Sequence, residues 1–230
     1  MGWAVLGGED AEFRSGEARL RACLGRPAAP GRYPTVIVLH GTTGLGAGMR
    51  RVATRFGEAG YVALVIDWQS HVEDPRDDDM VGYVNDAAAY LRAHEYVDAE
   101  RFAVAGYCRG GTIAYLALAA YPWLRAGVAF HGLPFYKELT ATRTRHAYDV
   151  AERIQAPLLI LHGAADERAP IEGVYRWAQR LEELGKTYAL KVYSSTGHAF
   201  TTPDGNNYQP EAAADAWEEA VRFLDRHLRT

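Results

Sequence analysis

The stretch "VAGYCRGGTIAYLALAAY", residues 104–121, joins a strand-like apolar run to a helix-like one through a turn that holds a cysteine between glycines. Its centre, "GYCRG" (106–110), has the form G-x-nucleophile-x-G, with cysteine in the position that serine often occupies. Small residues are required on either side of such a nucleophile, because strand and helix approach closely there. The stretch therefore predicts a strand–turn–helix unit of an α/β fold, with the Cys108 sulfur exposed at the edge of the sheet.

The rest of the chain repeats this alternation of strand and helix. Short runs rich in Val, Ile and Leu predict six buried strands, and their continuous apolar character is typical of a parallel sheet covered on both faces. The predicted strands span residues 35–40, 61–67, 101–107, 126–132, 157–163 and 188–195. Between them, helical patterns span residues 49–59, 84–95, 110–121, 174–184 and 211–228. We therefore expect a mostly parallel, doubly wound sheet with helices on both faces and functional loops at the carboxyl ends of its strands.

Three segments do not fit this alternation. The first 30 residues favour one or two antiparallel edge strands, of which "EARLRACL" is the clearest. Residues 68–83 are acidic and rich in turn formers, and residues 133–150 show no strong periodicity. We expect both of these segments to lie as loops over the carboxyl edge of the sheet.

Size and charge narrow the class of protein. A chain of 230 residues with 48% apolar content is suited to a single α/β domain, which we place over residues 1–230. The formal net charge of -4, without a basic stripe, argues against a nucleic acid or a membrane surface as partner. Two cysteines in no CxxC spacing argue against a disulfide framework or a zinc site, and no stretch resembles a secretory signal. We expect a cytoplasmic protein that carries no metal.

Cys108 has two interpretations. The N-terminus of a helix offers free N–H groups and partial positive charge, which favour a thiolate and hence an activated nucleophile. Alternatively, a free cysteine is often a small buried apolar residue. The surrounding glycines favour the nucleophile for Cys108, whereas Cys23, which has no flanking glycines, fits the buried interpretation.

A nucleophile of this kind needs a histidine to manage its proton and an acid to orient that histidine. In this kind of fold they follow in the order nucleophile, acid, histidine, and Asp166 and His198 each come just after a predicted strand in that order. Several other residues at predicted strand ends or in the acid loop compete for these roles. They are His40, His131 and His162 as bases, Glu167 and Glu172 as acids, and Asp67, which we interpret as structural.

The third requirement is a pair of N–H donors for a developing oxyanion. One should be the backbone N–H of Arg109, and the other should come from the loop "HGTTGLG" (40–46), with Thr42 as first choice and Gly41 as second. An ordinary strand-to-helix turn would also explain these glycines. Four aromatic side chains in the loops could line an apolar pocket or simply pack the loops. They are Trp68, Phe135, Tyr136 and Phe200.

Taken together, these motifs resemble the dienelactone hydrolase family of the α/β-hydrolase superfamily. "GYCRGG" resembles the cysteine elbow of the family, "HGAADERAP" its acid loop and "STGHAF" its histidine loop. The resemblance implies cysteine-dependent hydrolysis of activated esters, lactones or enol lactones. It also implies a small-molecule substrate, no cofactor, and a monomer or weak homodimer.

The chain departs from the pattern of the best-known family members in two ways. Gly41 stands where they have a glutamate that helps to generate the thiolate, so activation must differ. His71 and Thr202 stand approximately where they have arginines that hold a substrate carboxylate. We therefore count His71 among the candidate pocket residues. Four other arginines could replace the missing cations, namely Arg76, Arg143, Arg145 and Arg168.

The resulting hypothesis is a hydrolase with a Cys108–Asp166–His198 triad and an acyl-cysteine intermediate. Three alternatives remain open from the sequence. A degenerate hydrolase would bind a ligand without turnover, a redox sensor would use a reactive Cys108, and acyl transfer or lactonisation would pass the same acyl group to another nucleophile.

Overall fold

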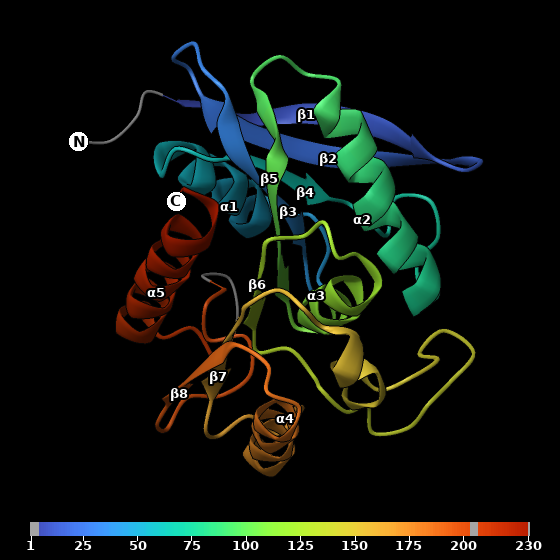
Figure 1. Ribbon diagram of the computed structural model, residues 1–230, viewed down its shortest axis with the longest axis vertical. Coiled ribbons are helices and arrows are strands. Elements are labelled where there is room, and N and C mark those ends of the chain that lie inside the picture. The colour runs from blue at the N-terminus through green and yellow to red at the C-terminus, as the bar shows by residue number, and fades with distance from the viewer. Residues whose placement is uncertain (1–4, 203–206, 230) are drawn as a thin grey trace.

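The computed structural model describes residues 5–202 and 207–229. It is built around one eight-stranded sheet with the strand order β1-β2-β4-β3-β5-β6-β7-β8 (Figure 1). The strands are β1 (Val5–Ser15), β2 (Ala18–Pro27), β3 (Tyr33–Leu39), β4 (Val62–Ile66), β5 (Val97–Tyr107), β6 (Ala126–Phe130), β7 (Leu158–Gly163) and β8 (Tyr188–Tyr193). Strands β3 to β8 are parallel to one another, so all six predicted core strands are confirmed.

The N-terminal edge of the sheet is antiparallel, as the sequence predicts. β1 and β2 form a hairpin, and β2 pairs antiparallel with β4 at Ala22–Ile66 and the following positions. The hairpin therefore covers the open side of β4 and extends the sheet beyond the parallel core.

Helices cover both faces of the sheet, which confirms the α/β-hydrolase fold. They are α1 (Ala47–Glu58), α2 (Asp77–Arg92), α3 (Arg109–Ala120), α4 (Ile171–Glu183) and α5 (Pro210–Leu228). α1 and α5 pack on one face, and α2, α3 and α4 pack on the other (Figure 1).

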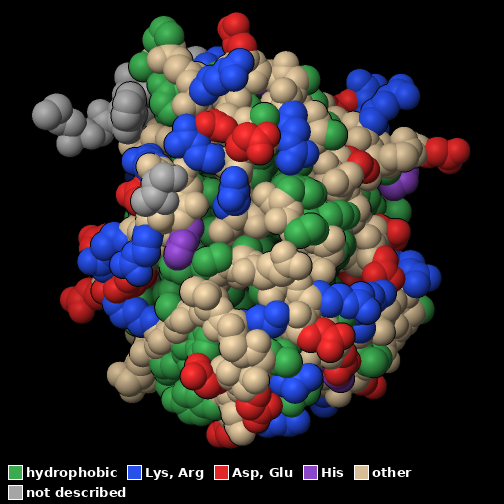
Figure 2. Space-filling view, in the orientation of Figure 1, with side chains coloured by type: hydrophobic (Ala, Val, Ile, Leu, Met, Phe, Trp, Pro, Cys, Tyr) green, Lys and Arg blue, Asp and Glu red, His purple; other side chains and the backbone are tan. Residues whose placement is uncertain are grey.

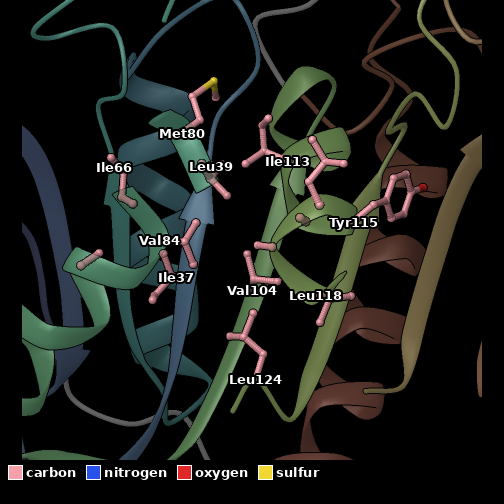
Figure 3. Close-up of a cluster of buried hydrophobic side chains, with 14 of the residues drawn as sticks. Ile37, Leu39, Ile66, Met80, Val84, Val104, Ile113, Tyr115, Leu118 and Leu124 are labelled. Carbon is pink, nitrogen blue, oxygen red and sulfur yellow. The ribbon is translucent and has the colours of Figure 1, made fainter. Parts of the chain in front are cut away.

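Alternate residues of each strand supply two separate cores. In β3, Ile37 and Leu39 point to the side of α2 and α3, whereas Val36 and Val38 point to the side of α1 and α5. Figure 3 shows the first of these cores, where Ile37 and Leu39 lie near Val104 and the α3 side chain Ile113. Both faces of the strands are buried, which explains why their sequences are continuously apolar.

Helical structure extends into both of the segments that we expected to be loops. α2 begins at Asp77 rather than near residue 84, because the acidic run that was expected to form a loop forms its first turn. Asp77, Asp78 and Asp79 lie where carboxylates interact favourably with the positive end of a helix dipole. Residues 133–150 also contain part of a short 3₁₀ helix, Ala147–Arg153, which had no periodic signal because it spans only seven residues.

The two loop segments meet at the carboxyl edge of the sheet. The N–H of Asp77 donates to the carbonyl of Thr142 at 2.8 Å. The first segment also contacts Arg109, which directly follows the β5 turn, and the Thr142 hydroxyl of the second segment donates to Asp74 at 2.9 Å. Their predicted location over this edge is therefore confirmed by contacts.

The surface mixes charges of both signs. On the face shown in Figure 2, Lys and Arg side chains alternate with Asp and Glu, consistent with the formal net charge of -4. Among the helices of the described residues, none is both long and apolar enough to cross a membrane.

The β5–α3 turn yields a stability prediction. A Cβ added at Gly106 would lie 2.0 Å from the carbonyl oxygen of Gly110, so strand and helix would have to separate. We expect Gly106→Ala to lower the free energy of unfolding by about 3 kcal/mol, measured by urea denaturation. Gly82→Ala is the control, because that α2 position is open and alanine should raise the stability by about 0.5–1 kcal/mol. Equal stabilities of the two variants would contradict this account.

Candidate active site

Cys108 occupies a strained turn between β5 and α3. Its φ of 55° lies in the left-handed region, which is uncommon for a residue with a side chain. The strain follows from close packing, because Gly110 lies so near β3 that a Cβ there would be 2.3 Å from the carbonyl oxygen of Leu39. The chain therefore turns sharply at Cys108, which is the N-cap of α3 and remains partly exposed.

Asp166 and His198 meet at the same edge of the sheet. Nδ1 of His198 lies 2.7 Å from Oδ2 of Asp166, and both side chains are buried. The other Asp166 oxygen, Oδ1, accepts N–H bonds from Arg168 and Ala169, both at 2.9 Å. These bonds hold the carboxylate in place, so that it fixes the orientation of the imidazole.

His198 and the Cys108 thiol influence one another electrostatically. Nε2 of His198 is buried and has no hydrogen-bond partner among the described residues, and the thiol and imidazole shift one another's pKa. Burial raises the pKa of Cys108, but His198, the N–H of Arg109 and Arg168 together hold it below its usual value. Burial lowers the pKa of His198, but Asp166 and Cys108 raise it to about 9. These shifts favour a thiolate–imidazolium pair.

A cavity of about 310 Å³ opens onto Cys108 and His198. Its lining includes both candidate oxyanion residues of the loop after β3, Gly41 and Thr42. A neighbouring cavity of about 480 Å³ shares His198 but does not reach the sulfur, so a carbonyl attacked by Cys108 must enter the smaller cavity.

The loop after β3 lies directly against the cysteine turn. A Cβ added at Gly41 would lie 3.1 Å from the Cys108 Cβ and 3.9 Å from its sulfur. Any larger residue at this position, including a glutamate, would require the loop or the cysteine turn to shift. The backbone N–H of Arg109 also helps to lower the pKa of the thiol.

His131 is a site residue that sequence reasoning did not select. It follows β6 with a φ of 42°, and its ring lies 4.9 Å from that of His198. Its Nδ1 accepts the Cys108 N–H at 3.1 Å, and its Nε2 lies 3.1 Å from the Thr201 hydroxyl. Burial holds the pKa of His131 well below its usual value, so the ring is neutral. Its only signal in the sequence was the repeated strand ending "AFHG".

The other competing residues lie away from the sulfur. His40 stacks on Trp68 and lies near Asp67, which also pairs with Arg21. His162 is buried, with its Nε2 2.8 Å from the carbonyl of Ala169. The two alternative acids, Glu167 and Glu172, are exposed side chains.

A sequence model of the dienelactone hydrolase family matches residues 20–228. The chain belongs to the dienelactone hydrolase family. It is 32% identical, over 99% of its length and 95% of the relative, to a Bradyrhizobium protein named "Probable 2-oxo-3-(5-oxofuran-2-ylidene)propanoate lactonase".

Solved structures agree with this assignment. A Klebsiella pneumoniae structure named "Putative Dienelactone Hydrolase" has a TM-score of 0.89 and 26% identity, covering 97% of this chain and 99% of that one. A dienelactone hydrolase-like promiscuous phosphotriesterase from metagenomic libraries has a TM-score of 0.82 at 22% identity, with the same coverage, and shares the fold. The chain is thus a carboxylic-ester or lactone hydrolase of the dienelactone hydrolase type.

The predicted pocket residues of this hydrolase lie elsewhere. None of Trp68, His71, Phe135, Tyr136 and Phe200 lines the cavity at Cys108. Trp68 is buried and donates its indole N–H to the carbonyl of His40, whereas His71 is exposed. Phe135 packs on Tyr148, Tyr136 is buried, and Phe200 packs behind His131. The aromatic residues fill the space between the loops and the sheet, so the alternative of loop packing is the one observed.

Of the four arginines considered as substitutes for the family cations, one lies at the cavity. Arg168 lines it, and so does Thr202. The other three candidates pair with carboxylates outside the cavity, Arg143 with Asp74 of the preceding loop and both Arg76 and Arg145 with Asp78 of α2. Within residues 5–202 and 207–229, no group of three His, Cys, Asp or Glu side chains could hold a metal ion.

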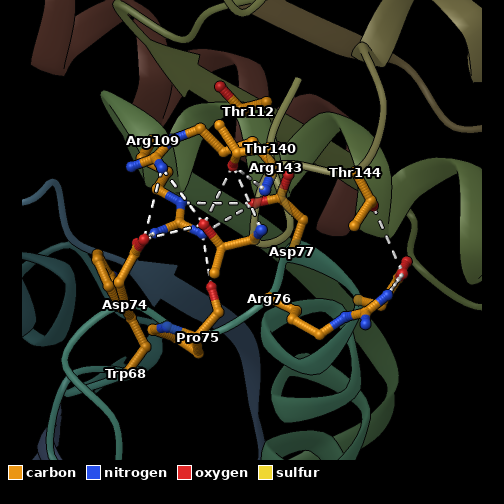
Figure 4. Close-up of polar contacts among 12 residues, drawn as sticks. Trp68, Asp74, Pro75, Arg76, Asp77, Arg109, Thr112, Thr140, Arg143 and Thr144 are labelled. Atoms are coloured by element: carbon orange, nitrogen blue, oxygen red, sulfur yellow. Dashed lines mark hydrogen bonds and ion pairs between the residues drawn. The ribbon is translucent and has the colours of Figure 1, made fainter. Parts of the chain in front are cut away.

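The side chain of Arg109 ties the cysteine turn to residues 74–77 before and at the start of α2 (Figure 4). It is almost fully buried, lies over the Trp68 ring and donates to the carbonyl of Pro75 at 2.6 Å. It also pairs with the buried Asp77 at 3.1 Å and with Asp74. The residue that offers its N–H to the site is therefore fixed to the N-terminus of α2.

This buried ion pair yields a second stability prediction. Arg109→Met leaves Asp77 buried without its counter-charge, and we expect the free energy of unfolding to fall by about 3 kcal/mol. Arg76→Met is the matched control, because Arg76 is exposed and its loss should change stability by less than about 1 kcal/mol. Urea denaturation measures both. The double variant Arg109→Met/Asp77→Leu should recover part of the loss; a double variant less stable than Arg109→Met would contradict this prediction.

Proposed function

We propose that this hydrolase cleaves esters and lactones through an acyl-cysteine intermediate on Cys108. The observation that carries the proposal is the meeting of a strained, partly exposed cysteine with the His198–Asp166 pair in one cavity. The pKa of the thiol is lowered while that of the imidazole is raised, as expected for a nucleophile and its base.

In the first half-reaction, the Cys108 thiolate attacks the carbonyl carbon of the substrate. The negative charge that develops on the carbonyl oxygen is stabilised by N–H groups of Arg109 and of the loop after β3, with Thr42 preferred over Gly41. As the tetrahedral intermediate collapses, the carbon–oxygen bond of the ester breaks and the imidazolium of His198 gives its proton to the leaving oxygen. In a lactone, that oxygen remains attached to the acyl chain.

In the second half-reaction, neutral His198 takes a proton from water, which attacks the thioester carbon. The carbon–sulfur bond then breaks, the acid product forms, and the thiolate–imidazolium pair is restored. Asp166 remains ionised and stabilises the imidazolium, in keeping with the low pKa that its hydrogen bonds maintain against the effect of burial.

The substrate we favour is a lactone that carries a carboxylate. The Bradyrhizobium relative is named for such a compound, a 2-oxo acid with an oxofuranylidene ring. Arg168 supplies an exposed positive charge at the cavity, and no ion pair to a carboxylate holds it among the described residues. Arg168 would thus replace the cations that His71 and Thr202 do not supply.

The acyl-enzyme is tested with an activated aryl ester and mass spectrometry. We expect brief exposure to p-nitrophenyl acetate to place an acetyl group on Cys108, and Cys108→Ala to lower kcat/KM by about 10⁴-fold or more. Cys23→Ala is the matched control, because Cys23 is fully buried in the core, and it should keep normal turnover. A folded Cys108→Ala variant with wild-type turnover would overturn the proposal. Ligand binding without any turnover in the wild type would instead favour the degenerate hydrolase.

The role of Arg168 is tested with a matched pair of substrates. For carboxymethylene butenolide, we expect Arg168→Gln to raise KM by about tenfold, the equivalent of 1.4 kcal/mol. For the uncharged carboxamide of the same lactone, KM should change by less than about twofold, which also controls for the effect of Arg168 on the Cys108 thiol. Arg145→Gln, a loop arginine paired with Asp78, should leave both values unchanged. An equal rise for both lactones would rule out carboxylate recognition by Arg168.

A further inference from the structure

A third cavity, the α1–α5 cavity, lies between α1 and α5, behind the turn that carries Cys108. Its volume is about 320 Å³, and it is walled by aromatic rings and two arginines of α1. The rings belong to Tyr107, Phe130, Tyr208 and Trp217, and the arginines are Arg51 and Arg55. No Asp or Glu is among its described lining residues, so the cavity combines apolar walls with uncompensated positive charge.

Arg55 is the unusual member of this lining. Its guanidinium lies 4.1 Å over the Trp217 ring and is half-buried, and burial lowers its pKa. Within the described parts of the chain, it has no hydrogen bond or ion pair, and Glu58 acts on it only as a charge at longer range. Cations that are withdrawn from water are normally paired, because desolvation of an unpaired charge is costly.

Some of the stacked arginines in this protein are paired with a carboxylate and others are not. Arg109 lies over Trp68 and pairs with Asp77, and Arg229 lies over Tyr61 and pairs with Asp225. Arg26, Arg92 and Arg176 stack on aromatic rings without an ion pair to a carboxylate among the described residues, and Arg55 does the same. What favours an anion at Arg55 is the second cation, Arg51, which lines the same cavity.

Arg51 strengthens this conclusion. It lies one helical turn before Arg55, lines the same cavity, and its charge further lowers the pKa of Arg55. Two like charges at positions i and i+4 destabilise a helix unless an anion lies between them. A bound carboxylate would convert this repulsion into two favourable contacts, one of which can be bidentate.

We propose that this cavity binds a small carboxylate with a flat apolar body. The carboxylate would pair with Arg55 and Arg51, and the ring would lie against Trp217 and Phe130. This site is separate from the catalytic cavity and from Arg168, so the proposal does not depend on the reaction assigned to Cys108.

The two cavities are nevertheless neighbours. Tyr107 lines both the catalytic cavity and the α1–α5 cavity. Thr201 lines the α1–α5 cavity, and its hydroxyl lies 3.1 Å from Nε2 of His131. The other nitrogen of His131 accepts the Cys108 N–H. A ligand in the α1–α5 cavity that touches Thr201 is therefore connected to the Cys108 backbone through two hydrogen bonds, Thr201 to His131 and His131 to Cys108.

The experiment is calorimetric titration with benzoate in an Arg168→Gln background, which removes the cation of the catalytic cavity. We expect the background protein to bind one equivalent of benzoate. Adding Arg55→Met should weaken that binding at least tenfold, because methionine keeps the apolar stem and removes the charge. The matched control is Arg92→Met in the same background. The Arg92 guanidinium lies 4.7 Å from the centre of the Trp123 ring, and neither residue lines this cavity. The loss of Arg92 should therefore change the benzoate affinity less than twofold.

Uncharged benzamide should bind at least tenfold more weakly than benzoate to the background protein. We also expect benzoate to leave the KM of that protein for p-nitrophenyl acetate unchanged. Turnover of p-nitrophenyl acetate equal to that of the Arg168→Gln background protein would show that the Arg55→Met variant is folded. Benzoate affinity that survives Arg55→Met would overturn the proposal, and so would competitive inhibition, which would place benzoate in the catalytic cavity. Neither result would affect the acyl-cysteine assignment.

Discussion

The close approach of α3 to the sheet is the constraint on which the rest of the site depends. Gly106 and Gly110 allow backbone to meet backbone where any side chain would clash, and the chain can then turn only by placing Cys108 at a φ of 55°. That conformation projects the sulfur from the edge of the sheet and places it beside the free N–H of the first helical residue. The remaining site residues reach the same point because parallel strands end along one edge.

The charged side chains of Asp166 and Arg109 affect Cys108 in different ways. Asp166 lies deep behind His198 and raises the affinity of the imidazole for a proton, which stabilises a thiolate next to it. Arg109 directs its side chain away from the sulfur into a buried pair with Asp77, so its positive charge is largely neutralised there. Its backbone N–H then acts on the sulfur from a fixed position.

Much of this arrangement was predictable because it rests on local patterns. The strands, the order of Cys108, Asp166 and His198, and the loop after β3 all follow from short motifs at strand ends. The start of α2 was missed because its acidic first turn has no apolar periodicity and is stabilised by the helix dipole. His131 was considered only as a competing base, and the wall residues Met49, Tyr107 and Asn207 were missed. Their roles depend on contacts between segments far apart in the chain, which no single motif encodes.

The hydrogen bonds of the cysteine backbone have a stereochemical consequence. The Cys108 N–H is shared between the carbonyl of Phe130 and Nδ1 of His131, so it is turned toward the sheet. In the proposed mechanism, the oxyanion therefore lies on the other side, between Arg109 and the loop after β3. The two faces of a substrate carbonyl are then inequivalent, and mirror-image lactones that differ at a ring carbon meet different walls while undergoing the same attack. The geometry of the Cys108 turn therefore allows the proposed site to distinguish between mirror-image lactones.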